Sequence, residues 1–295
     1  MSKKLLALAL ALGLSLSLAA CGGSQNSGTV TLTNPGDGAS NSGNTTGDVS
    51  STPETESTVL KVAATSIPHA EILEQVVGVL AEQGIELKVT EYGDYIVPNT
   101  AVEEGEEDVN YFQHLPYLDN FNAERGTHLV SVAGIHIEPM GVYAGSTASL
   151  AELPDGASVA VPNDATNEGR ALLLLEAQGL IKLSESAGVE ATPNDIAENP
   201  HNLKFVEVEA AMVPNVVSEL DIAVINSNYA MEAGFNPVED SLAIEDADSP
   251  YVNVLVIKEG NESNPAVQAL IDALETDAVR NFILEKYEGA VVPVF

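Results

Sequence analysis

The 295-residue chain combines an ordinary share of hydrophobic residues with an extreme acidic balance. It holds 44 acidic against 11 basic residues, giving a formal charge of −33 at pH 7, and it has a single cysteine. Such a chain has no basic stripe with which to displace counterions from phosphates, so nucleic acid is excluded as a partner. The same charge disfavours direct contact with anionic lipid and favours solubility. One cysteine also excludes an intrachain disulfide.

The N-terminus carries the pattern of a secreted lipoprotein. Lys3 and Lys4 precede an apolar run over residues 5–18, and small residues follow up to Cys21. About 14 apolar residues are too few for a membrane-spanning helix, which needs about 20, whereas this pattern is typical of a signal peptide. Because Leu-Ala-Ala-Cys at 18–21 resembles the bacterial lipoprotein box, we expect residues 1–20 to be removed and Cys21 to be lipidated.

Residues 21–58 read as this lipidated cysteine and a flexible tether. The segment is rich in Ser, Thr, Gly and Asn and has no aromatic residue, a composition that cannot bury enough surface to fold. A flexible coil of about 37 residues has a root-mean-square reach of roughly 35 Å. We therefore expect the globular part, residues 59–295, to be held clear of the headgroups on the extracytoplasmic face of the cell membrane.

The first part of the folded region alternates strands and helices. A buried strand over 59–64 is followed by an apolar helical stripe from Ile72 to Leu80 and by a strictly alternating strand over 85–89. This order is a βαβ unit, which predicts a parallel strand pair. The pattern continues with a strand near 109–112, a helix over 116–125 and a strand over 129–135.

A second set of elements begins near residue 140. We expect a strand over 158–161, a helix over 167–178 and strands over 203–208 and 221–225. After these elements, a strand over 251–257 and a helical C-terminal segment over 264–288 are expected. The fold class is therefore α/β with two lobes. Lobe 1 is expected to comprise residues 59–139 and 250–295, and lobe 2 residues 140–249. A ligand cleft is expected between them.

Aromatic residues gather where the strand near 109–112 ends. Tyr111, Phe112 and His114 precede Leu-Pro at 115–116, which places His114 on a turn. Aromatic rings in this place could line an apolar pocket. The alternative is that Tyr111 and Phe112 pack in the core.

Arg170 and Asn167 lie in the first turns of the helix that follows the strand over 158–161. Backbone donors at a helix N-terminus together with a guanidinium form a site suited to a carboxylate. Arginine is scarce in this chain, since the others are Arg125 and Arg280. The alternative for Arg170 is an ion pair with a neighbouring surface carboxylate.

The strand over 221–225 ends in two amide side chains, Asn226 and Asn228. Amides in this place could orient an ammonium or a carboxylate group. The alternative is a plain helix N-cap.

These stretches occur together with four further motifs in the same order along the chain: Pro68-His-Ala-Glu-Ile-Leu73, Asp94-Tyr95 to Pro98-Asn-Thr100, His136-Ile-Glu-Pro-Met140 and Ser249-Pro-Tyr251. The set is similar to the methionine-binding lipoproteins of bacterial ABC methionine importers, the NlpA- and MetQ-like substrate-binding proteins. The resemblance covers essentially all of residues 59–295. It implies a type II periplasmic-binding-protein fold, no enzymatic activity and no cofactor. It also implies a monomer that hands its ligand to a membrane permease and its ATPase.

The resemblance also implies roles for individual residues. It places the thioether of methionine among Tyr92 or Tyr95, Tyr111, Phe112, His114 and His136. It places the amino-acid backbone among Asn163, Arg170, Asn226 and Asn228, with Arg170 as the carboxylate anchor. Because a pocket distinguishes one methylene by only about 1–3 kcal/mol, D-methionine, a methionine dipeptide or another apolar amino acid stays open beside L-methionine.

Three other classes of protein compete with this interpretation. A zinc-binding transport lipoprotein could use His69, His114, His136 and Glu138 as nitrogen and oxygen ligands. An extracellular hydrolase could use histidine and carboxylates as acid and base, but the sequence has neither a Gly-x-Ser-x-Gly nor a His-Glu-x-x-His motif. An adhesive surface lipoprotein would suit the tether, but it needs no convergent arginine and asparagine groups at strand ends.

Overall fold

A computed structural model describes residues 57–246 and 249–295. The described residues belong to one compact unit. The expected signal peptide, the lipidation site Cys21 and nearly all of the tether lie outside the described residues.

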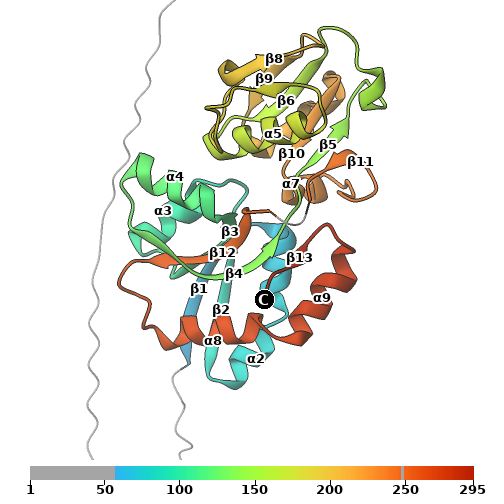
Figure 1. Ribbon diagram of the computed structural model, residues 1–295. Helices are drawn as coiled ribbons and strands as arrows, with labels where there is room; N and C mark the ends of the chain where they lie inside the picture. Colours follow the sequence, from blue (N-terminus) through green and yellow to red (C-terminus); the bar gives the residue numbers. More distant parts are fainter. Residues whose placement is uncertain (1–56, 247–248) are drawn as a thin grey trace, which may run out of the picture. The chain divides into compact units, whose positions relative to one another are not determined.

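The first sheet is built from both ends of the folded region (Figure 1). Its six strands lie in the order β13, β4, β12, β3, β1, β2. β1 pairs in parallel with both β2 and β3, which confirms the predicted parallel pair, whereas β12 runs antiparallel to β3 and β4. The strand bounds are β1 Thr58–Ala64, β2 Ile85–Glu91, β3 Val109–His114, β4 Leu129–Ile137, β12 Val252–Lys258 and β13 Val292–Pro293.

The second sheet is formed by the middle of the chain. Its five strands lie in the order β11, β5, β10, β6, β9, and a separate two-stranded sheet pairs β7 with β8. The chain therefore passes from the first sheet to the second between β4 and β5 and returns between β11 and β12 (Figure 1). The bounds are β5 Gly141–Ala144, β6 Ser158–Pro162, β7 Lys182–Leu183, β8 Ile196–Glu198, β9 Lys204–Val208, β10 Ile222–Ile225 and β11 Ser241–Ile244.

Helices cover both faces of the first sheet. The helices that cover it are α1 Glu71–Glu74, α2 Val77–Glu82, α3 Val97–Glu104, α4 Leu115–Arg125, α8 Pro265–Leu274 and α9 Asp277–Tyr287. The other helices are α5 Ala165–Ala177, α6 Val213–Val216 and α7 Ser227–Glu232. On β3, Tyr111 packs in a core with residues of α1, α2, α8 and α9. The next residue, Phe112, packs with residues of α3 and α4. Neighbouring strand residues point to opposite faces, so these two aromatic rings lie on different sides of the sheet.

The predicted elements are found close to their expected bounds, with two divided helices and several additions. The stripe from Ile72 to Leu80 is split into α1 and α2, and the C-terminal segment into α8 and α9. The second division has a local cause, because the Thr276 hydroxyl accepts from the Val279 amide and so caps a new helix. Helix α3 and the short strands β5, β7, β8, β11 and β13 were not predicted from the sequence.

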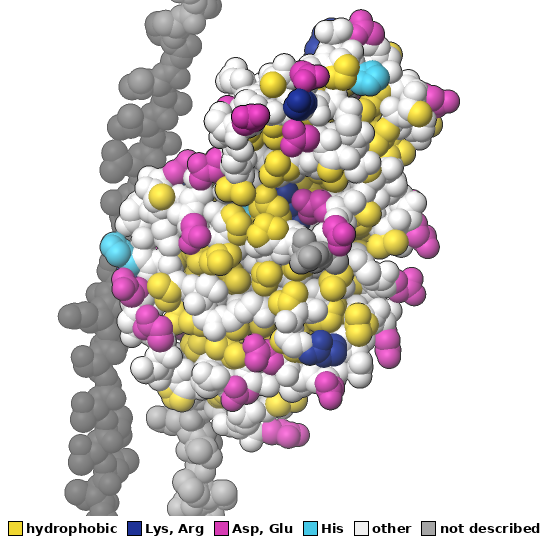
Figure 2. Space-filling view, in the orientation of Figure 1, with side chains coloured by type: hydrophobic (Ala, Val, Ile, Leu, Met, Phe, Trp, Pro, Cys, Tyr) yellow, Lys and Arg dark blue, Asp and Glu magenta, His cyan; other side chains and the backbone are white. Residues whose placement is uncertain are grey.

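On the face of the molecule shown in Figure 2, acidic side chains are spread out rather than gathered in one patch. Figure 2 shows them scattered across the viewed face of the described residues, among far fewer Lys and Arg side chains. This distribution fits a charge that acts through solubility.

Candidate ligand-binding site

Residues from both sheets line one pocket. It contains about 340 Å³ of space not filled by atoms, part of which is open to solvent. Its lining comes from the ends of β3 and β12, the segment after β4, and the first turns of α4, α5 and α7. The lining residues are Tyr95, Phe112, Gln113, His114, Tyr117, Glu138, Asn167, Arg170, Asn226, Ser227, Asn228 and Asn253.

One side of the pocket, which we call the aromatic wall, consists of Tyr95, Phe112, His114 and Tyr117. The Tyr95 ring centroid lies 5.8 Å from those of Phe112 and Tyr117, and the Tyr117 hydroxyl donates to the Tyr95 carbonyl at 3.1 Å. Apart from the histidine nitrogens and the phenol hydroxyls, this wall presents carbon. It therefore suits an apolar or thioether side chain.

His114 is the polar member of this wall, and its tautomer follows from its contacts. Its Nδ1 accepts from the Tyr117 amide at 3.1 Å, so its Nε2 carries the proton and donates to Asn167 Oδ1 at 3.1 Å. Burial, aided by the nearby Arg170 charge, lowers the pKa of His114 to about 3. The ring is neutral at physiological pH and acts as an oriented hydrogen-bond donor.

The opposite side, which we call the polar wall, consists of Asn167, Arg170, Asn226, Ser227 and Asn228. Arg170 is only 3% exposed although it is charged. Its Nε donates to both carboxylate oxygens of Glu245 at 2.9 and 3.0 Å, and its Nη2 donates to the Glu138 carbonyl at 2.7 Å. The guanidinium also lies 4.3 Å from the Tyr251 ring centroid. Arg170 is thus fixed against both segments that connect the two sheets.

The three asparagines of the polar wall are each held by a hydrogen bond to another pocket residue. Asn167 Oδ1 accepts from Asn226 Nδ2 at 2.8 Å, and Asn228 Oδ1 accepts from the Tyr95 hydroxyl at 2.6 Å. Within the described part of the chain, Asn226 Oδ1 and Asn228 Nδ2 are buried without a hydrogen-bond partner. An unpaired buried acceptor and an unpaired buried donor cost free energy, so the pocket is prepared for a ligand that carries both a donor and an acceptor.

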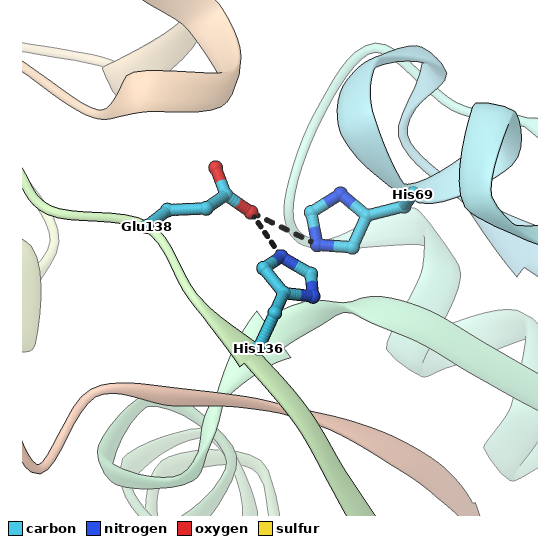
Figure 3. Close-up of side chains that lie close together, drawn as sticks. All are labelled: His69, His136 and Glu138. Carbon is cyan, nitrogen blue, oxygen red and sulfur yellow. Dashed lines mark hydrogen bonds and ion pairs between the residues drawn. The ribbon is translucent and has the colours of Figure 1, made fainter. Parts of the chain in front are cut away.

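A cluster of ionisable side chains lies directly behind the pocket. His69 Nε2 and His136 Nε2 lie 3.2 and 2.8 Å from the same oxygen of Glu138, as Figure 3 shows. His136 Nδ1 is hydrogen-bonded to the Tyr111 hydroxyl, and His69 Nδ1 lies 2.7 Å from Thr65 Oγ1. Burial lowers the pKa of His69 to about 4 and that of His136 to about 3, and it raises the pKa of Glu138.

The structure brings six of the ten predicted ligand-binding residues into the pocket lining: Tyr95, Phe112, His114, Arg170, Asn226 and Asn228. Tyr111 and His136 are completely buried in the cluster behind it. Asn163 lines a neighbouring hollow beside Tyr95, and Tyr92 hydrogen-bonds to Glu107 at 3.4 Å, away from the pocket.

The structure also decides three alternatives that the sequence leaves open. Tyr111 packs in the core, whereas Phe112 reaches the pocket. Arg170 does pair with a carboxylate, Glu245, but it is buried and lines the pocket as well. Asn226 occupies the N-cap position of α7 without a side-chain cap bond, because its amide is directed to Asn167.

Several residues of the pocket lining are not among the ten ligand-binding residues predicted from the sequence. Tyr117, Asn167 and Glu138 stand inside motifs already singled out in the sequence, so their position in the chain was an available signal. Asn253 follows the Ser249-Pro-Tyr251 motif and enters the pocket from β12. Glu245, the partner of Arg170, lies 75 residues away in sequence, and no local pattern marks it.

The residues considered for a zinc site separate into two places. His69, His136 and Glu138 offer three ligand atoms within 4.8 Å of one another, a spacing that could hold a metal ion. His114 does not join them, because its Nε2 bonds to Asn167. A closed structural zinc site needs four ligands, so this set would be incomplete without another group.

Among the described residues, no helix combines the length and the apolar character required to cross a membrane.

Comparisons with known proteins agree on one family. The sequence model described as NlpA lipoprotein matches residues 60–295. The membrane lipoprotein TpN32 of Treponema pallidum is 42% identical over 231 residues, which covers 78% of this chain and 86% of that protein.

Two solved structures are similar in fold and sequence. A nutrient-binding protein from Burkholderia cenocepacia bound to methionine has a TM-score of 0.78 and 43% identity, covering 80% of this chain and 100% of that one. A periplasmic substrate-binding protein of an ABC transporter from Coxiella burnetii has a TM-score of 0.76 and 38% identity, with the same coverage. These likenesses confirm the predicted two-lobed periplasmic-binding-protein fold.

Proposed function

Because this chain belongs to the NlpA lipoprotein family, we propose that it captures methionine outside the membrane and delivers it to an ABC permease. The similar Burkholderia cenocepacia protein, whose structure holds methionine, supports this ligand. The ABC-transporter protein of Coxiella burnetii supports the delivery step. L-Methionine is the ligand we put first, with D-methionine and methionine dipeptides as related ligands.

The observation that carries the proposal is the contrast between the two walls of the pocket. A free amino acid needs partners for a carboxylate and an ammonium group, and the polar wall offers the Arg170 guanidinium, the unpaired Asn228 Nδ2 and the unpaired Asn226 Oδ1. A hydrogen bond to a charged group contributes about 1.5–3 kcal/mol. We therefore assign most of the binding free energy to the polar wall, with Arg170 as the carboxylate anchor.

We assign the choice among amino acids to the aromatic wall. A thioether against an aromatic edge contributes about 0.3–1.5 kcal/mol per contact. Tyr95, Phe112 and Tyr117 are the aromatic rings that could offer such edges, and their ring centroids lie 5.8–6.2 Å from one another. Tyr111 and His136 are completely buried in the cluster with Glu138, so we assign them no direct contact with the ligand.

Capture and delivery require the two lobes to open and close. We propose lobe 1 at residues 59–139 and 250–295 and lobe 2 at 140–249, with the ligand buried between them on closure. The Tyr95–Asn228 and His114–Asn167 hydrogen bonds connect the two walls, and we propose that they break when the lobes open. A monomer tethered by lipidated Cys21 on the extracytoplasmic face would then meet the permease and its ATPase.

The test is calorimetric titration of the full chain in mild detergent, after unfolding and refolding have removed retained ligand. We expect saturable binding of L-methionine with a stoichiometry near 1:1. L-Alanine serves as the matched ligand control, because it keeps both charged groups and lacks the thioether chain. Absence of heat with L-methionine, D-methionine and methionine dipeptides would contradict the proposed ligand class.

A further inference from the structure

Glu138 is a buried carboxylate that lines the pocket, and the proposed contacts with methionine do not yet include it. It follows β4 directly, lies on the segment that leads into the second sheet, and is 6% exposed. Burying a carboxylate is expensive unless a cation or several hydrogen bonds compensate it. The surroundings of Glu138 therefore indicate what the pocket is built to receive.

Two histidines support this carboxylate from one side only. Figure 3 shows both of their contacts meeting at one carboxylate oxygen, Oε1, while the other oxygen points away from the imidazole rings. If the hydroxyls of Tyr111 and Thr65 donate to the two Nδ1 atoms, both Nε2 atoms carry a hydrogen. His136 Nε2 then donates to Glu138 Oε1, whereas His69 Nε2 donates to Asn253 Oδ1 at 3.0 Å and lies 3.2 Å from Glu138 Oε1. The backbone amide of Asn228 also donates to the Glu138 carboxylate.

These supports are hydrogen bonds rather than counter-charges. Burial holds the pKa of both histidines near 3 to 4, so their rings are neutral at physiological pH. Arg170 is the one cation among the described residues that line the pocket, and its guanidinium is engaged by Glu245 in a bidentate pair. The charge of Arg170 acts on the Glu138 carboxylate, but the guanidinium is paired with Glu245 and donates to the carbonyl oxygen of Glu138 rather than to its carboxylate. Glu138 is thus a carboxylate of the pocket lining that has no ion pair with this arginine.

We propose that Glu138 is the residue that recognises the α-ammonium group of the ligand, with His69 and His136 as positioning residues for its carboxylate. This inference rests on the proposed function, because it assumes an amino-acid ligand. The polar wall then divides its work: Arg170 takes the carboxylate and Glu138 takes the ammonium. Asn226 Oδ1, buried and unpaired, is a second acceptor for the same group.

A metal ion in place of an ammonium is the competing occupant, and one of the two distances argues against it. His136 Nε2 and Glu138 Oε1 are 2.8 Å apart, a hydrogen-bond distance. Two ligands of a tetrahedral zinc ion, with bonds of about 2.0–2.1 Å, lie roughly 3.3 Å apart. The 3.2 Å between His69 Nε2 and Glu138 Oε1 matches that spacing, so the direct binding test with ZnCl₂ decides between the two occupants.

The first test uses the unmodified full chain and three ligands. L-Methionine is compared by calorimetry with 4-(methylthio)butanoate, which lacks the amino group, and with L-methioninamide, which keeps the amino group and loses the carboxylate charge. We expect the compound without the amino group to bind at least about 100-fold more weakly than L-methionine, because it leaves Glu138 buried and unpaired. Binding within tenfold of L-methionine would overturn the proposal.

The second test uses Glu138→Gln, which keeps the size of the side chain and removes its charge. We expect it to weaken L-methionine by about 30-fold or more and to leave the affinity for 4-(methylthio)butanoate equal or higher, because no charge is then left unpaired beside that ligand. Equal losses for both ligands would assign Glu138 a merely structural role and overturn the proposal. Glu107→Gln is the matched control, since Glu107 is a buried carboxylate, 8% exposed, that does not line the pocket.

The remaining outcomes are also decisive. Saturable binding of ZnCl₂ by the unmodified chain, lost in Glu138→Gln, would replace the ammonium by a metal and overturn the proposal. L-Methionine binding that does not depend on the amino group would refute this inference alone. Failure of the unmodified chain to bind L-methionine at all would refute the proposed function, and this inference with it.

Discussion

The two walls of the pocket differ in how much they depend on the rest of the molecule. The aromatic wall comes from the segment before α3, the end of β3 and the start of α4, and its rings pack against one another. The polar wall depends on distant residues, because Arg170 is held by Glu245 and by the carbonyl of Glu138. Apolar packing tolerates local adjustment, whereas a buried charge requires every one of its partners.

This difference implies different consequences of mutation. A change in the polar wall should affect binding and folding together, because each group leaves a buried partner unpaired. A change in the aromatic wall should mainly alter the choice among ligands, because the lost contact is small and its neighbours can adjust. The predictions below test this contrast.

The largest effect is expected from Arg170→Ala. It removes the carboxylate anchor and leaves Glu245, whose side chain is 13% exposed, without its cation. We expect L-methionine affinity to fall by at least about 100-fold and the free energy of unfolding to fall by about 3–5 kcal/mol. Calorimetry and urea denaturation measure the two effects.

The matched control for this change is Arg280→Ala. The Arg280 side chain is 37% exposed and its nearest carboxylate oxygen, on Asp277, is 4.0 Å away. Exposed pairs contribute about 1 kcal/mol or less, so both binding and stability should stay near the values of the unmodified chain. A variant of Arg170 that still bound L-methionine tightly would refute its assignment as anchor.

A smaller effect, confined to selectivity, is expected from Phe112→Leu. The substitution keeps an apolar side chain in the pocket and removes the aromatic edge. We expect the preference for L-methionine over L-norleucine to fall by roughly 2- to 12-fold, the equivalent of about 0.3–1.5 kcal/mol for a thioether contact. Competition calorimetry with the two amino acids measures this ratio.

Phe121→Leu provides the comparison for this change, because Phe121 packs in the same apolar cluster but does not line the pocket. It should lower stability and leave the ratio unchanged. An unchanged ratio in Phe112→Leu itself would show that the aromatic wall does not select the thioether.

The smallest effect near neutral pH, which grows only as the solution is acidified, concerns His114. Its pKa is lowered from 6.5 to about 3 by burial and by Arg170, so below pH 6.5 the unfolded chain binds a proton that the folded chain does not. Stability is therefore lost as the pH falls from 6.5 towards 3, by up to about 1.4 kcal/mol per pH unit from this residue. His114→Gln should reduce the slope by that amount, measured by urea denaturation at several pH values.

Other buried groups also make the stability depend on pH. The lowered pKa values of His69 and His136 add to the loss of stability in acid, whereas the raised pKa of Glu138 reduces it. The difference between the variant and the unmodified chain therefore isolates the contribution of His114. Parallel stability curves for the two proteins would contradict a buried, neutral His114.

The sequence supported the prediction of the aromatic wall and of Arg170 better than that of the partners which hold them. Strand alternation places Tyr111 and Phe112 on opposite faces, so the two could not both line one pocket. The scarcity of arginine drew attention to Arg170, whereas Glu245 and Asn253 reach the site through long-range pairing of strands. Such pairings depend on tertiary structure, and local residue patterns do not encode them.

The central claim is that the polar wall holds the head group of an amino acid and the aromatic wall holds its side chain. A crystal structure of the chain with L-methionine tests it most directly. We predict a ligand carboxylate oxygen within about 3.2 Å of an Arg170 nitrogen and the sulfur beside Phe112 and Tyr95. A methionine bound in the reverse direction, or outside this pocket, would contradict the account.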